Sequence, residues 1–240
     1  MKDLLEPLIY PHNLLLYGLL FACIAYRKKG LWCLLLFYYL LGNTWVANQV
    51  RQWYQQQAVA SAPSVLGRTP DLFVMLGCGG SAEQIPACAA ARIQQLKSEI
   101  SRLPQAAPLA VIITTRYCEP YLAVLQQTTR QWAVDCFDAG ENTYQEFQTL
   151  AKRLEKQQSI RFITSDFHSW RVRQLIKEYQ LSASVGVVRS QTFRPVNCGL
   201  NCLLTVNLSN LDLYSKLMAE FASYAVYRVA GKEVTGVVSD

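Results

Sequence analysis

The sequence predicts an α/β protein whose Rossmann-like, mostly parallel sheet has helices on both faces and is preceded by two transmembrane helices. From residue 70 onward, short apolar runs alternate with helix-like segments, a pattern typical of a mostly parallel sheet. Upstream, the stretches 7–26 and 30–50 contain no formally charged residue. Each is about 20 residues long, which as a helix measures ~30 Å and matches the apolar core of a bilayer.

The two uncharged stretches are apolar all round rather than along one stripe, which favours membrane spans over a buried helical hairpin. A cleaved signal peptide would carry its positive charges before the apolar run, whereas Arg27, Lys28 and Lys29 follow it here. The positive-inside rule places this basic loop in the cytoplasm. We therefore expect an inner-membrane protein with a two-helix anchor at 1–57, a linker at 58–69 and a periplasmic α/β domain at 70–240.

The α/β domain is expected to contain five strands, each a short apolar run. These are 72–76, 109–114, 133–137, 160–164 and 183–188. The expected helices are 87–102, 121–130, 144–156, 167–180 and 211–229. Residues 193–207 are expected to be irregular, with a short strand at 203–206 as one option.

The chain has eight cysteines, of which Cys23 and Cys33 fall in the expected spans. The other six lie in the outer domain, where an oxidising compartment permits disulfides. Cys198 and Cys202 form the best local pair by spacing. The alternative is that all six cysteines are unpaired and serve as small buried hydrophobic residues. No CxxC pair occurs and His168 is the only histidine outside the spans, so we expect no metal. The basic residues are dispersed beyond residue 58, and we expect no nucleic-acid partner.

A glycine-rich turn follows the first expected strand, where Gly77, Gly79 and Gly80 belong to a GxGxxA pattern. Glycines at a strand–helix turn let backbone N–H groups approach a phosphate; the alternative is a tight turn that merely requires glycine. A dinucleotide site would need an acidic residue after the second strand, which instead ends in Thr115 and Arg116. We therefore expect no NAD, FAD or other cofactor.

Polar residues also follow the third and fourth expected strands. His168 and Arg171 are three residues apart in a predicted helix that begins after Ser165, so they share a face. Thr143 and Glu146 match a helix-capping box, which leaves Asn142 outside the cap. Parallel strands bring all these turns to one edge of the sheet.

Together these motifs resemble the YdcF/SanA/ElyC family of bacterial envelope proteins over roughly residues 71–229. The stretch 71–80 is similar to the family's D-x-x-V-x-L-G-G-G, 140–146 to its S-x-N-T-x-E-N, and 163–172 to its V-T-S-x-x-H-x-x-R-A. The sequence departs from these patterns at 115–116, at Gly140 and at 145–146. The resemblance implies a Rossmann-like domain that acts in cell-envelope assembly, with Glu119 in the place of the family's acid after the second strand. The expected two-span layout resembles the ElyC branch.

From these observations we expect a protein that binds or processes a phosphorylated, lipid-linked precursor of peptidoglycan or another envelope glycan. Its expected partners are the membrane, that precursor and envelope-assembly proteins, and whether it is an enzyme is left open. The alternatives are a non-catalytic envelope scaffold or barrier protein and a protein that binds a nucleotide or adenosyl ligand. The expected catalytic residues are His168 as acid or base, Arg171 as cation and Asn142 as orienting group. The expected ligand-binding residues are Gly77, Gly79, Gly80, Glu119, Thr143 and Ser165.

Overall fold

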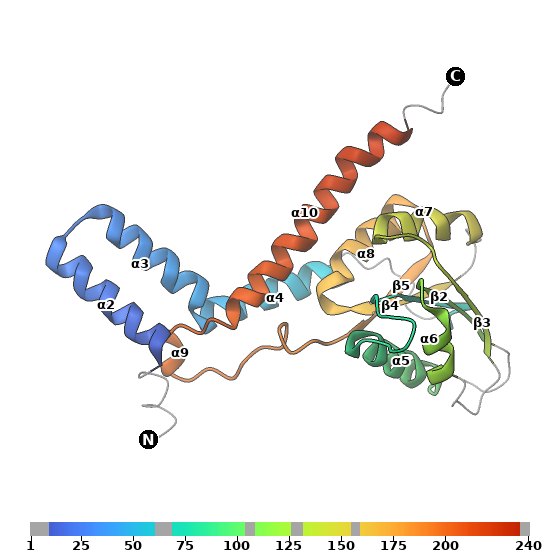
Figure 1. The fold of residues 1–240 in the computed structure, drawn as a ribbon, viewed down its shortest axis with the longest axis horizontal. Coiled ribbons are helices and arrows are strands. Elements are labelled where there is room, and N and C mark those ends of the chain that lie inside the picture. Colours follow the sequence, from blue (N-terminus) through green and yellow to red (C-terminus); the bar gives the residue numbers. More distant parts are fainter. Residues whose placement is uncertain (1–9, 61–68, 104–108, 126–131, 155–158, 236–240) are drawn as a thin grey trace. The chain divides into compact units, whose positions relative to one another are not determined.

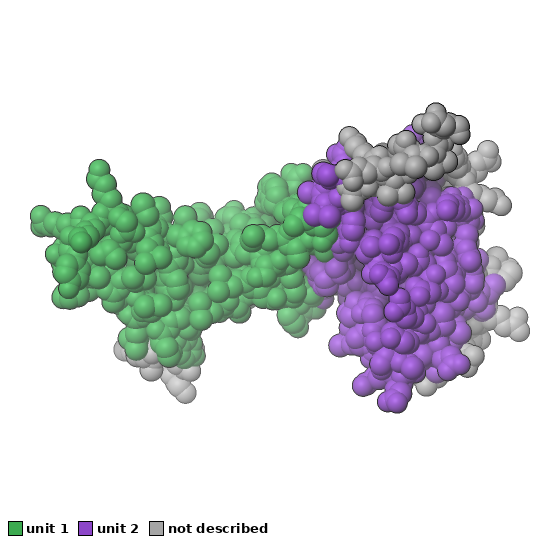
Figure 2. Space-filling model, turned by 45° about the horizontal axis from the view of Figure 1, so that its top comes forward, with its two compact units in different colours: residues 1–57, 190–223 green, residues 58–189, 224–240 purple. Residues whose placement is uncertain are grey.

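The computed structural model describes residues 10–60, 69–103, 109–125, 132–154 and 159–235. The chain forms two compact units (Figure 2). Unit 1 comprises Met1–Gln57 and Ser190–Ser223, and unit 2 comprises Ala58–Arg189 and Tyr224–Asp240. This division differs from the expected boundaries, because residues 190–223 return to the N-terminal segment instead of completing the α/β domain.

Unit 2 contains a five-stranded sheet in which every neighbouring pair is parallel. All five strands expected from the sequence are present: β1 (Leu72–Leu76), β2 (Leu109–Thr114), β3 (Trp132–Phe137), β4 (Ile160–Ser165) and β5 (Ala183–Val188). Their order in the sheet is β3-β2-β1-β4-β5, which matches the first five strands of the Rossmann arrangement. The chain adds β2 and β3 on one side of β1 and then β4 and β5 on the other. The order of strand addition therefore reverses between β1 and β4, while all strands stay parallel.

Helices cover both faces of this sheet, with α5 and α6 on one face and α7 and α8 on the other (Figure 1). The bounds are α5 (Ala87–Ile100), α6 (Cys118–Leu125), α7 (Thr143–Arg153) and α8 (Asp166–Glu178). Alternate residues of β1 separate into the two cores: Phe73 and Met75 pack toward α5 and α6, and Leu72, Val74 and Leu76 toward α7 and α8. Burial on both faces explains why β1 is a continuous apolar run.

Unit 1 is helical. It contains α2 (Pro11–Tyr26), α3 (Lys29–Gly42), most of α4 (Thr44–Ala60), the short α9 (Asn201–Leu204) and the first part of α10 (Asn210–Thr235). The expected strand option at 203–206 is wrong, because its first two residues are the end of α9. Only Val206 pairs with another segment in strand fashion, through an isolated antiparallel bridge to Asn43.

The prediction of two transmembrane helices is also wrong. None of the helices in the described parts of the chain combines the length and the apolar character needed to cross a membrane. α2 has 16 residues and α3 has 14. The second uncharged stretch is divided at Asn43, which ends α3 and whose side-chain oxygen accepts from the Val46 N–H, 3.1 Å away, at the start of α4. A run of apolar residues thus did not make one continuous helix.

The inner-membrane localisation and periplasmic orientation rested on those spans and are corrected with them. A different observation bears on the compartment: the structure contains three disulfides, Cys78–Cys88, Cys118–Cys136 and Cys198–Cys202. The predicted Cys198–Cys202 pair is thus confirmed, and only Cys23 and Cys33 are free. Three disulfides are typical of a protein in an oxidising, extracytoplasmic compartment.

Asparagine side chains hold the returning segment of unit 1 in place. Asn13 accepts from the Val206 N–H at 2.7 Å, and Asn43 donates to the Cys202 carbonyl at 2.8 Å. The buried Arg51, expected just after the second span, donates to Asn210 at 3.0 Å and to the Thr192 carbonyl at 2.8 Å. The register of this segment is therefore fixed by directional polar contacts.

Candidate functional site

A polar pocket of about 360 Å³ lies at the carboxyl edge of β1, β2 and β3. The turns after these three strands supply its walls, as expected for a parallel sheet. The lining residues are Gly77, Gly79, Thr114, Thr115, Arg116, Tyr117, Asp138, Gly140, Glu141, Asn142, Thr143 and Glu146. Four of the residues expected to bind a ligand or act in catalysis are thus brought together: Gly77, Gly79, Asn142 and Thr143.

The loop after β1 requires glycine at defined positions. A Cβ on Gly77 would clash with the Thr114 carbonyl oxygen, so only glycine allows β1 and β2 to end this close together. Gly79 and Gly80 have φ values of 72° and 125°, which L side chains rarely adopt. The buried Tyr121 hydroxyl donates to the Gly79 carbonyl at 2.9 Å and accepts from the Cys78 N–H at 3.3 Å. Within the described residues, the Gly79 and Gly80 N–H groups have no protein acceptor.

The start of α7 shows that the capping-box prediction was shifted by one residue. Asn142 is the N-cap, and its side-chain oxygen accepts from the Gln145 N–H at 3.0 Å. Gln145 reaches back and accepts from the Glu141 N–H at 2.9 Å. Asn142 therefore lines the pocket while capping α7, and Glu146 is left free of any capping role.

Glu146 is directed instead toward the pocket. Its carboxylate accepts from the Thr114 hydroxyl at 2.9 Å. Burial raises the pKa of Glu146 to about 7, although this hydrogen bond and the positive charges of Arg92 and Arg171 lower it in part. A carboxyl group with a pKa near neutrality can donate or accept a proton at physiological pH.

Arg116 supplies the positive charge of the pocket lining. It pairs with Asp138 at 3.2 Å and with Glu141 at 3.5 Å, and all three side chains are largely exposed. Such exposed pairs contribute only about 0–1 kcal/mol each. The Arg116 guanidinium therefore remains able to contact an anion that enters the pocket.

The crevice between β1 and β4 is occupied by the buried side chain of Arg92, from α5. It donates to the carbonyls of Leu76 and Gly77 at 2.7 Å each, and to the Ser165 hydroxyl at 3.0 Å. Open α/β sheets bind dinucleotides across this crevice, where the strand order reverses. Here Arg92 closes it, which displaces the pocket toward β2 and β3.

His168 and Arg171 face each other on the first turns of α8. An Arg171 Nη lies 3.0 Å from His168 Nδ1; because a guanidinium only donates, Nδ1 accepts and a neutral imidazole carries its proton on Nε2. Neither residue lines the pocket. Arg171 acts on it at a distance, because its charge favours the ionised form of Glu146.

The remaining expected residues lie apart from the pocket lining. Ser165 is buried against Arg92, Gly80 lies outside the lining, and Glu119 is exposed on the first turn of α6. No group of three or more histidine, cysteine, aspartate or glutamate side chains within the described ranges could hold a metal ion.

Sequence reasoning missed Glu146, Arg92 and Arg116 as members of the site or its support. A signal existed for Glu146, because Asn142 is also a good N-cap and would have released Glu146 from the capping box. A signal also existed for Arg116, because it follows β2 at the edge of the sheet where the other turns meet. Arg92 gave no such signal, since it belongs to a helix whose other buried residues are apolar.

Fold and site together define a Rossmann-like α/β protein with a polar pocket beside its reversal point. Comparison of the chain with protein-family models, curated proteins and solved structures finds no match.

Proposed function

We propose that this chain is an extracytoplasmic protein of cell-envelope biogenesis whose unit 2 binds a phosphorylated precursor in the β1–β3 pocket. The motif resemblance is the reason for the envelope assignment. The observation that carries the binding proposal is the meeting of Gly79, Arg116 and the Asn142-capped start of α7 around one cavity. Glycine N–H groups, a guanidinium and a helix N-terminus all favour a phosphate.

Glu146 gives this site a proton to exchange. Below its pKa of about 7 the carboxyl group is neutral and does not repel a phosphate. Above that pH the carboxylate does repel it. A bound phosphate dianion also raises the pKa of Glu146 further, so binding near pH 7 takes up protons from the solvent.

The alternative of a nucleotide or adenosyl ligand is disfavoured by Arg92. Its guanidinium bonds the ends of both β1 and β4, where a dinucleotide would otherwise cross the sheet. A non-catalytic scaffold needs no small-molecule ligand, so a measurement of ligand binding separates it from the proposal.

Calorimetry with a soluble hexose 1-phosphate, on the full chain, tests the proposal. We expect weak binding that strengthens as the pH falls through 7, with an enthalpy that depends on the buffer's heat of ionisation. Arg116→Gln should weaken binding about tenfold or more, because a charge-assisted hydrogen bond is worth ~1.5–3 kcal/mol. Glu146→Gln should abolish the proton uptake.

Arg153→Gln is the matched control for Arg116→Gln. Arg153 is comparably exposed and also pairs with an aspartate, Asp135, at 3.1 Å, but it lies outside the pocket. Equal losses in the two variants, or no binding of the sugar phosphate by the unmodified chain, would favour the scaffold alternative.

A further inference from the structure

The Cys198–Cys202 disulfide of unit 1 differs from the two disulfides of unit 2 in exposure and spacing. Cys198 is the one exposed half-cystine of the six, within the exposed run 194–200. The two cysteines are separated by 4 positions, against 10 for Cys78–Cys88 and 18 for Cys118–Cys136. A short loop gains little from closure, so this bond contributes less to the stability of the folded chain than either disulfide of unit 2, and the fold depends on it least.

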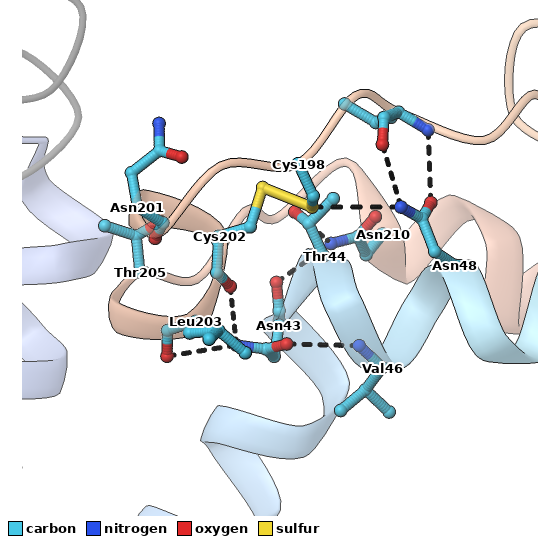
Figure 3. The surroundings of a disulfide bond; sticks show 12 residues. Asn43, Thr44, Val46, Asn48, Cys198, Asn201, Cys202, Leu203, Thr205 and Asn210 are labelled. Carbon is cyan, nitrogen blue, oxygen red and sulfur yellow. Dashed lines mark hydrogen bonds between the residues drawn. A yellow bond between two sulfur atoms is a disulfide. The ribbon is translucent and has the colours of Figure 1, made fainter.

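Hydrogen bonds from Asn48 of α4 and from Asn43, the residue that precedes α4, hold the two sides of this disulfide, as Figure 3 shows. The Asn48 amide donates to the Cys198 sulfur at 3.8 Å, while the Val196 backbone fixes its orientation through bonds of 2.8 and 3.1 Å. On the other side, Asn43 holds the Cys202 carbonyl at 2.8 Å. These contacts do not depend on the S–S bond, so both sulfurs stay close together when it is broken.

We propose that Cys198–Cys202 is a thiol–disulfide exchange site that reacts with a dithiol partner. The partner's thiolate attacks the exposed Cys198 sulfur, the S–S bond breaks, and its electron pair passes to Cys202, which takes a proton from water. The partner's second thiol loses its proton and attacks the partner's own sulfur in the mixed disulfide. Cys198 leaves as a thiolate, and the partner leaves as a disulfide.

Asn48 has a defined part in this cycle. Its amide N–H stabilises the Cys198 thiolate as it leaves, and a stabilised thiolate is the better leaving group. The held ends of the segment then favour re-formation of the bond by the reverse exchange, in which the partner's disulfide takes up the two electrons and two protons and leaves as the dithiol. This chemistry is separate from ligand binding in unit 2 and does not rest on it.

Graded reduction of the full chain tests the site. The protein is treated with increasing dithiothreitol, quenched with iodoacetamide, and each cysteine is quantified by peptide mass spectrometry. We expect Cys198 and Cys202 to be alkylated first, on the order of tenfold faster than the four cysteines of unit 2, because attack depends on access. If either unit 2 disulfide opens first or at the same rate, the proposal is overturned.

Two sets of variants sharpen the test with oxidised glutathione as the probe. Cys202→Ser should form a mixed disulfide at Cys198 faster than Cys198→Ser does at the less exposed Cys202, and equal rates would argue against a directed site. Asn48→Ala should raise the pH at which Cys198 becomes alkylated after reduction. Gln52→Ala, one turn further along the same helix and exposed, should not; a shift in both variants, or in neither, contradicts the role given to Asn48.

Discussion

In unit 2 the strands bury apolar side chains between two layers of helices, and polar groups gather at the carboxyl edge. In unit 1 several of the most buried side chains are polar, among them Asn13, Asn43, Arg51 and Asn210. The exterior is reversed as well. Of the large apolar side chains that the described residues expose, all but Val226 and Val229 belong to unit 1.

The difference shows two ways of fixing a fold. Unit 2 gains its stability mainly from apolar burial, which is large and non-directional. Unit 1 places amides and a guanidinium where they pair with backbone carbonyls, which contributes less energy per contact but specifies one register. The exposed apolar side chains of α2 and α3 are numerous. Such an exposed apolar surface is typical of a surface that contacts other molecules.

The largest expected effect comes from Arg92, a buried charged side chain among the apolar residues of unit 2. Arg92→Met should destabilise unit 2 by about 4 kcal/mol, because the Leu76 and Gly77 carbonyls and the Ser165 hydroxyl lose a charged donor. Hydrogen exchange of β1 and β4 amides measures this loss. Arg153→Met, at an exposed position, is the control and should change the exchange little. If the β1 and β4 amides of Arg92→Met stay as protected as in the unmodified chain, apolar burial alone is enough to hold these strands together.

A smaller effect should follow from Glu146 and depend on pH. The folded pKa of about 7 lies above the ordinary value of 4.5, so the folded state binds the proton more tightly. The stabilisation is present below pH 4.5 and is lost as the pH rises to 7. Glu146→Gln stays neutral and does not lose this stabilisation. Its free energy of unfolding, relative to that of the unmodified chain, should therefore increase by about 3 kcal/mol over this pH range.

Chemical denaturation of unit 2 at several pH values, followed by the exchange of its strand amides, measures that difference. Other carboxyl groups titrate in both proteins and cancel. A difference that is constant with pH would mean that Glu146 has an ordinary pKa and is no candidate for proton exchange.

The smallest expected effect tests the polar contacts of unit 1. Asn43→Ala removes the cap of α4 and the donor to the Cys202 carbonyl, and should cost about 1 kcal/mol. Leu36→Gln, on the exposed face of α3, should cost less. Exchange of the α4 amides separates the two variants, and a larger loss for Leu36→Gln would mean that unit 1 relies on its apolar residues after all.

The sequence allowed the sheet to be predicted well and unit 1 poorly, for one physical reason. Strands buried on both faces are continuous apolar runs, and Leu72–Leu76 could be recognised from composition alone. The runs at 7–26 and 30–50 are equally apolar, but their helices end at Tyr26 and Gly42. The end at Gly42 is followed by Asn43, whose side chain donates to the Cys202 carbonyl far along the chain. Local patterns do not contain such a contact.

The candidate site was predictable to the extent that strand order follows from the chain. The turns at Gly77, Gly79 and Asn142 meet because parallel strands end at one edge. His168 and Arg171 follow β4, beyond the crevice that Arg92 occupies, and do not reach the lining. Which neighbouring turns form a cavity depends on side chains that fill the spaces between strand ends, and Arg92 was not recognisable as one of these.

The two disulfides of unit 2 both fasten loops that bound the pocket. Cys78 sits between Gly77 and Gly79 and is tied to Cys88 in the first turn of α5, while Cys118, next to Tyr117, is tied to Cys136 in β3. The cavity is therefore preorganised: its walls are set when the chain oxidises, before any ligand arrives. A ligand that fits need not order these loops, and so loses less of its interaction energy to conformational entropy.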